Sequence, residues 1–421
     1  MSPIHLNKII LLIIEICFDT EGLIVLTFQT ETMTGLHGKC AIVGVGETKV
    51  GRVPRVTAMS HALQAAKRAI EDAGLSNTDI DGVLTRKPFL DPTLCYSLQI
   101  AENLGIRPRY TTDLDTCGTT PITMVITSVM AIFAGLCRTV LCTFSRDDNW
   151  VLKQRVPKHG KLNWGSEDFE YPWGFIEAPM AFAMAARRHM HLYGTTSEHF
   201  GAIAIAMRKY ASMNPNAQMR KPITLQDYLA SPLFAEPFRL LDCSLVSDGG
   251  GAVVVTSAEM AKHLRKAPIY ILGLGQHNSA HSYFGPLEVI TPLREAGNEA
   301  YRMAGMSHRD IDVAEVYDCF TYSVLVQLED LGFCKKGEGG PFVEGGRIEL
   351  GGELPVNTHG GLLSQAHLSG MLHITEAAHQ LWGESGERQV KNAKVALVTG
   401  LGIRQAPFGT TGVLILGKEA S

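Results

Sequence analysis

The stretch AAKRAIEDAGLSNTDIDGVL, residues 65–84, is matched later in the chain by AGNEAYRMAGMSHRDIDVAEV, residues 296–316. Each stretch predicts a helix that ends at Ala-Gly, then a polar turn, then Asp-Ile-Asp leading into a strand. The same 231 residues separate three matched pairs: Gly74 and Gly305, Ile80 and Ile311, and Asp81 and Asp312. A helix cap, a turn and a strand that recur at one fixed spacing indicate a duplicated α/β unit.

Strands that read as unbroken apolar runs indicate a sheet covered on both faces. Three of them are RTVLCTF (138–144), GAVVVTS (251–257) and KVALVTG (394–400). The segment ITMVITSVMAIFA (122–134) is apolar on nearly every side, so a helix formed there must be buried between two layers. Two α/β halves around shared central helices predict a five-layered αβαβα sandwich.

We therefore divide the chain into an N-terminal half, residues 38–262, and a C-terminal half, residues 263–421. Residues from about 145 to 245 have no counterpart in the second half and predict an inserted, helix-rich lobe. We expect residues 1–37 to be a non-native or disordered extension, with the native start near Met33. Their longest unbroken apolar run is far shorter than the roughly 20 residues that a membrane-spanning helix needs.

Charge and cysteine content exclude several classes of function. The formal net charge is −4, and no Lys/Arg block resembles a nucleic-acid-binding surface. Nine cysteines include no Cys-x-x-Cys pair and no Cys/His spacing typical of zinc, so we expect no metal site in this chain. Scattered thiols of odd number indicate reduced cysteines and a cytoplasmic protein.

Three polar stretches fall at predicted strand ends, where α/β sheets place ligands. They are DTCGTTP (115–121), EVYDCFTY (315–322) and NTHGGLLSQAHLSG (357–370). In the first, Thr120 suits a helix N-cap and Pro121 the first helical position. Cys117, Gly118 and Thr119 would then lie at the positive end of a helix dipole, which favours a thiolate or an oxyanion.

These three stretches, with VSDGGGAVVV (246–255), resemble the thiolase superfamily over about residues 39–418. More narrowly they are similar to its lipid-transfer-protein branch, which includes sterol carrier protein thiolases and steroid side-chain aldolases. The spacing from Asn357 to His367 matches the thiolase loop that ends in Gly-His. The resemblance implies the duplicated five-layer fold, a homodimer, and coenzyme A thioesters as substrates.

The chain departs from the thiolase pattern at both catalytic cysteines. Counted back from Gly135, which ends the buried helix, the nucleophile position falls at Gly118, one residue after Cys117. The acid/base cysteine near the chain end is replaced by Gly400 or Leu401, in TGLGIR. The strand-end motif that usually carries Asn or His carries Tyr317.

A Claisen condensation needs an acyl-enzyme thiolate and a second group that deprotonates the incoming thioester. Without both cysteines, the surviving groups suit retro-aldol cleavage of a β-hydroxyacyl-CoA through a stabilised thioester enolate. We predict Tyr317, His367 and His359 as catalytic residues, with Cys117 as a further candidate. The predicted oxyanion and substrate turns contain Gly118, Thr119, Asn357, Gly360 and Gly361.

Two other functions stay open at this point: an acetyl-CoA acyltransferase or thiolase that uses Cys117, and a non-catalytic scaffold that binds acyl-CoA. Lys153, Arg155 and Lys158 lie in the inserted lobe, where thiolases bind the CoA nucleotide. The resemblance to aldolases also implies a small OB-fold, zinc-ribbon partner protein in a heterotetramer. We expect no binding to nucleic acid or membranes.

Overall fold

The structure is a computed structural model that describes residues 34–88, 93–148, 178–279, 289–402 and 409–420. It also describes two short antiparallel strands, β1 (Ile16–Phe18) and β2 (Ile24–Leu26), within a separate unit of residues 1–35. Residues 36–421 form the second unit, which contains the candidate site. The limits of the two halves at 262 and 263 stay predictions.

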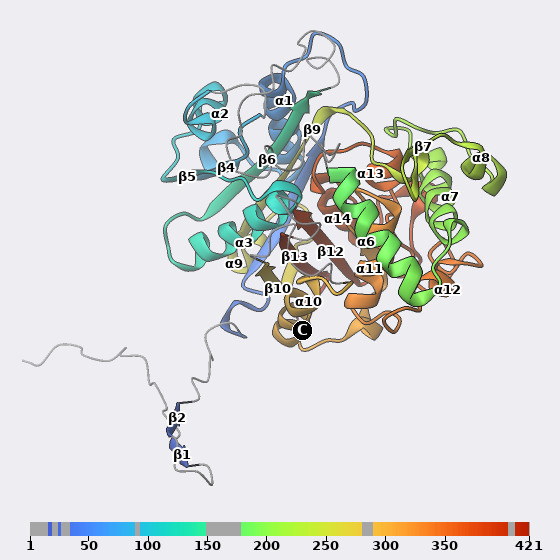
Figure 1. The fold of residues 1–421 in the computed structure, drawn as a ribbon. Helices are drawn as coiled ribbons and strands as arrows, with labels where there is room; N and C mark the ends of the chain where they lie inside the picture. The colour runs from blue at the N-terminus through green and yellow to red at the C-terminus, as the bar shows by residue number, and fades with distance from the viewer. Residues whose placement is uncertain are drawn as a thin grey trace, which may run out of the picture. The chain divides into compact units, whose positions relative to one another are not determined.

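A nine-stranded sheet runs through the described part of the second unit, in the order β11-β12-β13-β10-β3-β9-β6-β4-β5. The N-terminal half supplies β3 (Cys40–Glu47), β4 (Gly82–Thr85), β5 (Tyr110–Asp113), β6 (Thr139–Asp147) and β9 (Asp248–Ser257). The C-terminal half supplies β10 (Ile269–Asn278), β11 (Val313–Glu315), β12 (Val395–Gly402) and β13 (Thr410–Gly417). Each half contributes one continuous block of strands (Figure 1).

The two blocks join where β3 and β10 pair antiparallel, through Ile42 with Ile269 and Ala41 with Tyr270. The sequence predicts two separate sheets, and the structure links them at this edge. The first strand of each half would otherwise leave its backbone N–H and C=O groups unpaired, so the short ladder satisfies some of them.

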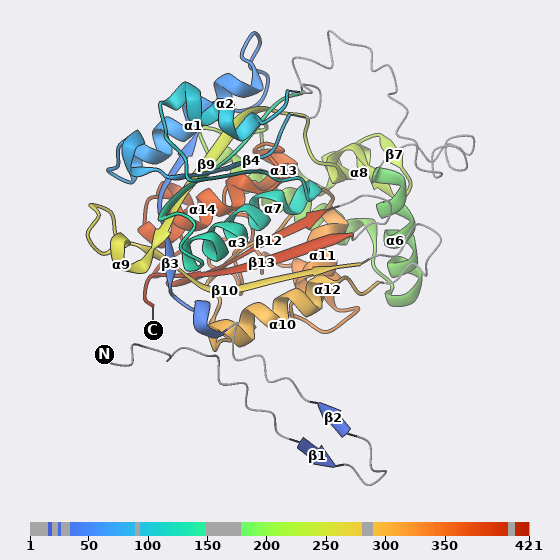
Figure 2. The same cartoon turned by 90° about the vertical axis from the view of Figure 1, so that its left-hand side faces the viewer.

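The helices sort into one inner and two outer layers. α3 (Thr120–Phe133) packs against β6 and β9 on one side and against β12 and β13 on the other. α14 (Met371–Trp382) likewise contacts both β9 and β12. Outside them, α1 (Ala58–Asp72) and α2 (Tyr96–Leu104) cover the N-terminal block, and α10 (Leu293–Ala304) covers the C-terminal block. Figure 2 shows the resulting five layers edge-on, which is the predicted sandwich.

The internal repeat is present in the three-dimensional structure. The 3₁₀ turns Asn77–Asp79 and His308–Asp310 occupy matched positions, and a serine-aspartate capping box closes each one. Small side chains let helix and strand approach closely at both places. A Cβ on Gly46 would lie 2.2 Å from the Ala65 carbonyl oxygen, and a Cβ on Gly275 would lie 1.8 Å from the carbonyl oxygen of the matched Ala296.

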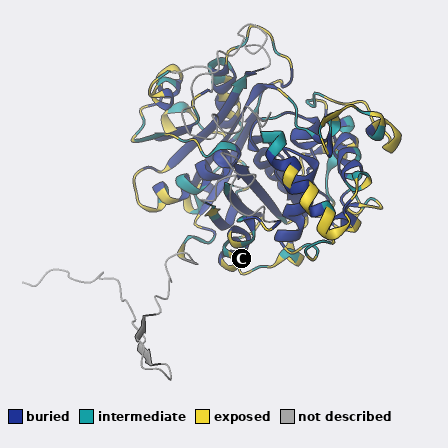
Figure 3. Ribbon diagram, viewed as in Figure 1, coloured by how far each residue is buried: buried dark blue, intermediate teal, exposed yellow. Residues whose placement is uncertain are grey.

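The described part of the inserted lobe is rich in helix. It contains α6 (Ala178–Tyr193), α7 (Ser197–Met213), α8 (Leu225–Ala230) and the hairpin β7 (Leu233–Ala235) with β8 (Phe238–Arg239). α6 and α7 pack on α11 (Thr321–Asp330), which is buried along its whole length. The sheet and most of the inner helices are buried, whereas the outer helices and the last turn of α3 keep exposed residues (Figure 3). Among the described helices, none is long and apolar enough to cross a membrane.

Candidate active site

Tyr317 follows β11 and has a rigidly held backbone. Its N–H donates to the Thr399 hydroxyl at 2.9 Å, and Gln327 Nε2 donates to its carbonyl at 2.7 Å. Thr399 in turn donates to Gln327 Oε1 at 2.7 Å, which closes a buried ring of hydrogen bonds. The phenol ring stacks on His373, and the residue is only 3% exposed. Tyr317 is therefore fixed by groups from three different elements.

The Tyr317 hydroxyl lies directly over Gly118. A Cβ added to Gly118 would meet this hydroxyl at 2.3 Å and the Leu401 carbonyl oxygen at 2.1 Å, so position 118 has no room for a side chain. Gly118 is the position at which the sequence comparison expects the thiolase nucleophile. The phenol occupies the space that a nucleophilic side chain would need.

His367 stands beside the same hydroxyl. Its Nε2 lies 3.4 Å from the Tyr317 hydroxyl oxygen, and its Nδ1 lies 3.5 Å from the Ser244 hydroxyl. Its backbone N–H donates to the Ser247 hydroxyl at 3.0 Å. The structure thus brings together Tyr317, His367 and Gly118, three residues that are far apart in the sequence.

Burial sets the protonation state of both side chains. Burial raises the pKa of Tyr317 well above its usual value, so the side chain is a neutral phenol at physiological pH. Burial, and then the positive charges of Arg146 and Arg86, lower the pKa of His367 well below its usual value. A neutral phenol and a neutral imidazole in contact form an acid and a base that can exchange a proton.

The turn at residues 115–119 differs in one respect from the predicted oxyanion site. The Thr119 N–H donates to the Thr116 carbonyl at 3.2 Å, so this group is already engaged. Cys117 has a left-handed backbone (φ 54°), and its N–H donates to Asp115 Oδ1 at 3.0 Å. Of the two N–H groups predicted to bind an oxyanion, that of Thr119 thus has a backbone partner, and the role of Gly118 stays a prediction.

The position of the second thiolase cysteine is closed as well. A Cβ on Gly400 would lie 2.9 Å from Thr119 Cα, and Leu401 is completely buried. A larger side chain at Gly400 would push against the start of α3. The structure thus gives a steric reason for glycine at this position.

Three residues of the predicted substrate turn, Asn357, Gly360 and Gly361, lie against other groups of the protein. The Asn357 side chain accepts a hydrogen bond from the Val316 N–H at 2.6 Å and donates one to the Val316 carbonyl at 2.8 Å. The backbone of a neighbouring strand would make the same two bonds. Gly360 faces Ala211, and a Cβ on Gly361 would lie 1.9 Å from an Asp318 carboxylate oxygen. Asp318 accepts hydrogen bonds from the N–H groups of Leu362 and Leu363, at 2.8 and 3.2 Å. These contacts fix the loop that leads to His367.

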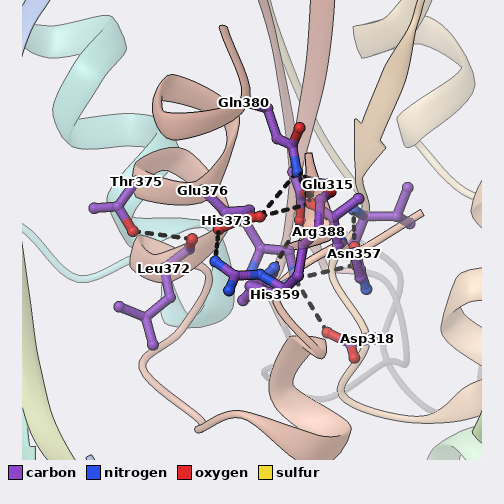
Figure 4. Close-up of polar contacts among 12 residues, drawn as sticks. Glu315, Asp318, Asn357, His359, Leu372, His373, Thr375, Glu376, Gln380 and Arg388 are labelled. Carbon is purple, nitrogen blue, oxygen red and sulfur yellow. Dashed lines mark hydrogen bonds and ion pairs between the residues drawn. The ribbon is translucent and has the colours of Figure 1, made fainter. Parts of the chain in front are cut away.

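The His359 side chain is buried against a carboxylate and a second histidine, and its catalytic role stays a prediction. It is 1% exposed, and its Nδ1 lies 2.8 Å from Glu315 Oε2. Its ring packs edge-on against His373, with 4.6 Å between centroids. Figure 4 shows His359 within a buried cluster that also contains Glu376 and Arg388. The sequence pattern gave the loop correctly, but the side-chain direction depends on tertiary contacts.

The charges in this buried cluster compensate one another. Burial opposes protonation of His359, but the charge of Glu315 outweighs it and raises the pKa of the imidazole. Burial likewise opposes ionisation of Glu376, yet Arg388 at 3.0 Å and His359 keep its pKa below the usual value. The cluster therefore holds paired charges behind Tyr317 and His373.

The remaining predicted residues are Lys153, Arg155 and Lys158, which lie outside the described residues. In the part of the chain that is described, no group of three His, Cys, Asp or Glu residues has the arrangement of a metal site. Sequence reasoning missed Ser244, Ser247, Arg86 and Arg146. Of these, Arg86 carried a usable signal, because it lies 231 residues before Tyr317 in the repeat.

Known proteins resemble this chain in both sequence and fold. Residues 273–418 match the family described as thiolase C-terminal domain-like. A steroid side-chain-cleaving aldolase from Thermomonospora curvata is 35% identical over 400 residues, which cover 92% of this chain and 100% of that protein. A 17-hydroxy-3-oxo-4-pregnene-20-carboxyl-CoA lyase from Mycobacterium tuberculosis is 36% identical over 394 residues, which cover 91% and 100%.

A solved structure of an Ltp2-ChsH2(DUF35) aldolase superposes with a TM-score of 0.82 at 35% identity, covering 91% of this chain and 98% of that one. Human mitochondrial 3-ketoacyl-CoA thiolase has the same fold, with a TM-score of 0.66 at 16% identity over 91% and 99% of the two chains. Sequence and fold agree. The chain belongs to the thiolase superfamily, in its sterol carrier protein thiolase-like branch.

Proposed function

We propose that this protein is an enzyme that cleaves a carbon–carbon bond of a β-hydroxyacyl-CoA thioester by a retro-aldol reaction, of the steroid or lipid side-chain type. One observation carries the proposal. The Tyr317 hydroxyl fills the space above Gly118 and lies 3.4 Å from His367, so an acid/base pair stands where a nucleophile would be. The relatives named as an aldolase and a CoA lyase support the same reaction.

For the bond to break, the protein then needs to supply only proton transfers and a hydrogen bond to the enolate oxygen. The neutral His367 takes the proton of the β-hydroxyl group, and the hydroxyl carbon becomes a ketone as the Cα–Cβ bond breaks. The electron pair of that bond passes into the thioester as an enolate, whose oxygen faces the Gly118 N–H. Tyr317 protonates the enolate at Cα and recovers a proton from His367. Acid/base groups of this kind contribute about 10²–10⁴-fold to rate.

The neighbouring contacts of the loop support this pair rather than react. Asp318, Asn357 and Gly361 fix the loop that carries His367, and we assign His359 to the same supporting role through Glu315. Coenzyme A is the proposed carrier of the substrate, with Lys153, Arg155 and Lys158 as its proposed nucleotide contacts. No metal is proposed for this chain.

A homodimer that binds a small OB-fold, zinc-ribbon partner to form a heterotetramer is the proposed assembly. β5 is an edge strand that no other described strand covers, and Met130, Phe133 and Leu136 near the end of α3 are 51%, 63% and 49% exposed. An open strand edge and exposed apolar side chains each favour pairing with a second copy. The Ltp2-ChsH2(DUF35) structure supports the partner protein. The free thiols of the eight cysteines at positions 40–334 support a cytoplasmic location.

A second candidate is acyl transfer through Cys117. The thiol is partly exposed, and its charge acts on Tyr317, raising the pKa of the phenol after the larger effects of burial and Cys319. Relatives named acetyl-CoA acetyltransferase are also similar to this chain, at 32% identity for the one from Methanothermobacter thermautotrophicus.

The two candidates separate in one experiment. The protein, with and without a zinc-ribbon partner, is incubated with 17-hydroxy-3-oxo-4-pregnene-20-carboxyl-CoA, and the products are followed by mass spectrometry. Retro-aldol cleavage yields the 17-ketone and propionyl-CoA, with full activity kept in Cys117→Ala. An acyl adduct on the Cys117 peptide, together with loss of turnover in Cys117→Ala, would contradict the proposal and favour acyl transfer.

A further inference from the structure

Arg86 holds the position in the N-terminal half that Tyr317 holds in the C-terminal half. The repeat aligns β4 with β11. Arg86 is the first residue after β4 and Tyr317 is the second residue after β11, and the common spacing of 231 separates the two. Side chains alternate between the two faces of a strand. Arg86 and Leu84 therefore share one face, as Tyr317 and Glu315 do. By this symmetry Arg86 points toward the inner layer, where the site is located.

Arg146 reaches the same side from the neighbouring strand. Cys142 of β6 contacts Ser128 of α3, with 3.1 Å between Sγ and Oγ, so Cys142 faces the inner helix. Alternation then places Phe144 and Arg146 on that face too. The Arg86 guanidinium lies over the Phe144 ring, 5.8 Å from its centroid. Arg86, directly after β4, and Arg146 of the adjacent parallel strand β6 thus share one face.

Arg86 is connected to the turn that contains Gly118. It pairs with Asp115 at 3.0 Å, and the other oxygen of Asp115 accepts the Cys117 N–H at 3.0 Å. Arg86 Nε is buried and has no hydrogen-bond partner among the described residues. Arg146 is held by Asp148, whose carboxylate accepts from its Nε at 2.6 Å. The Nε–H donor of Arg86 therefore has no partner among the described residues, which indicates that it binds a ligand.

The charges of both arginines reach the catalytic pair. After burial, Arg146 and Arg86 are the main groups that lower the pKa of His367. Arg146 also acts to lower the pKa of Tyr317, against the larger effect of burial. A positive field at these two side chains would also act on any charge that forms on a substrate between them.

We propose that Arg86 and Arg146 form a cationic pair on the wall of the active site, which stabilises the negative charge of the thioester enolate. This proposal rests on the retro-aldol function proposed above. Breaking the Cα–Cβ bond transfers an electron pair to the thioester, so one negative charge appears in a largely buried site. Fixed positive groups already aimed at that charge stabilise it without reorganisation. The pair also keeps His367 unprotonated and ready to act as the base.

The first test needs no substrate. The pKa of His367 is measured by NMR in protein labelled at histidine Cε1, with the His367 signal identified by its loss in His367→Gln. In the double variant Arg86→Met, Arg146→Met we expect this pKa to rise by about one unit. The double variant Arg86→Lys, Arg146→Lys keeps the charges and should stay near the wild type. Arg187→Met removes an exposed arginine, paired with Glu236 at 3.5 Å, and serves as the control.

The second test uses acetoacetyl-CoA as a probe, because its acidic Cα gives an enolate with its own near-ultraviolet absorbance. Wild-type protein at saturation should increase the enolate fraction, and the double methionine variant should lose at least about 10-fold of that increase. Thermal unfolding checks that both double variants are folded. Equal enolate fractions in wild-type and methionine variants, or an unchanged His367 pKa, would overturn the proposal. Failure of the wild type to bind the probe, with the His367 shift present, would instead count against the proposed CoA-thioester function.

Discussion

In the N-terminal half, β4 and the residue after it read Gly-Val-Leu-Thr-Arg (82–86); the matched stretch of the C-terminal half reads Val-Ala-Glu-Val-Tyr (313–317). The aspartate before each stretch fixes the backbone in the same way. Asp81 Oδ1 accepts the N–H groups of Arg138 and Thr139, at 2.7 and 2.9 Å. Asp312 Oδ2 accepts those of Lys394 and Val395, also at 2.7 and 2.9 Å. One frame therefore occurs twice.

The side chains that face the inner layer differ between the halves. Leu84 and Glu315 are both fully buried, but Leu84 packs as an apolar residue while Glu315 starts a network of paired charges. Arg86 brings a permanent charge to the site, and Tyr317 brings a transferable proton. The difference teaches that duplication supplied two equivalent strand ends, and that each end then took a separate chemical role.

The largest expected effect comes from Tyr317→Phe. Loss of the hydroxyl removes the acid while the ring stays on His373, so kcat should fall about 10³-fold with little change in thermal stability. The measurement is steady-state cleavage of the CoA thioester. Tyr210→Phe is the matched control, because it removes another buried phenol, which donates to the Ile348 carbonyl at 3.1 Å outside the site. Nearly wild-type kcat in Tyr317→Phe would remove Tyr317 from the mechanism.

Arg388→Met tests the charged network of the C-terminal half. Without Arg388, Glu376 stays buried without its cation, and the free energy of unfolding should fall by about 3 kcal/mol. The N-terminal control is Arg138→Met, since Arg138 is mostly exposed beside Asp81 at 3.7 Å and should cost well under ~1 kcal/mol. Urea denaturation measures the unfolding free energy of both variants. Equal losses would show that the cluster is not distinctive of the C-terminal half.

The pH dependence of kcat/KM sharpens the role of His367. Its pKa is lowered in the folded protein, first by burial and then by Arg146 and Arg86, so the neutral base persists as the pH falls through the usual value of 6.5. Activity should therefore decline only at a pH well below 6.5. An acid limb at or above 6.5 in the wild type would show that His367 is not the base.

The smallest effects should come from Asp81→Asn and Asp312→Asn. Each change weakens two hydrogen bonds to backbone N–H groups, at a cost of about 1–2 kcal/mol in unfolding free energy. Asp81 is the more buried of the two and should cost more. Neither variant should change kcat, because both residues hold strands together. A loss of kcat in one variant alone would contradict the equivalence of the two frames.

Periodicity and spacing gave the frame of this fold because they depend on local contacts. The apolar run at residues 122–134 predicted a buried helix, and α3 does pack between the two strand blocks, while Met130 and Phe133 near its end are 51% and 63% exposed. The join of the two strand blocks through Ile42 and Ile269 had no such local signal, since strand pairing depends on distant partners.

The candidate site shows the same limit. Spacing selected Tyr317, His367 and Gly118, and the structure brings them together. The same reasoning put His359 in the chemistry, but its side chain faces Glu315. Direction could not be predicted there, because it depends on where a buried carboxylate lies in space.

The sequence by itself determined the duplication and the inner helix, because each is a matter of residue type and spacing, and its resemblance to thiolases implied the loss of both catalytic cysteines. Only the tertiary structure decided that the Tyr317 hydroxyl fills the space over Gly118. That contact depends on strand ends from opposite halves meeting across the inner layer, where a glycine leaves room for a phenol.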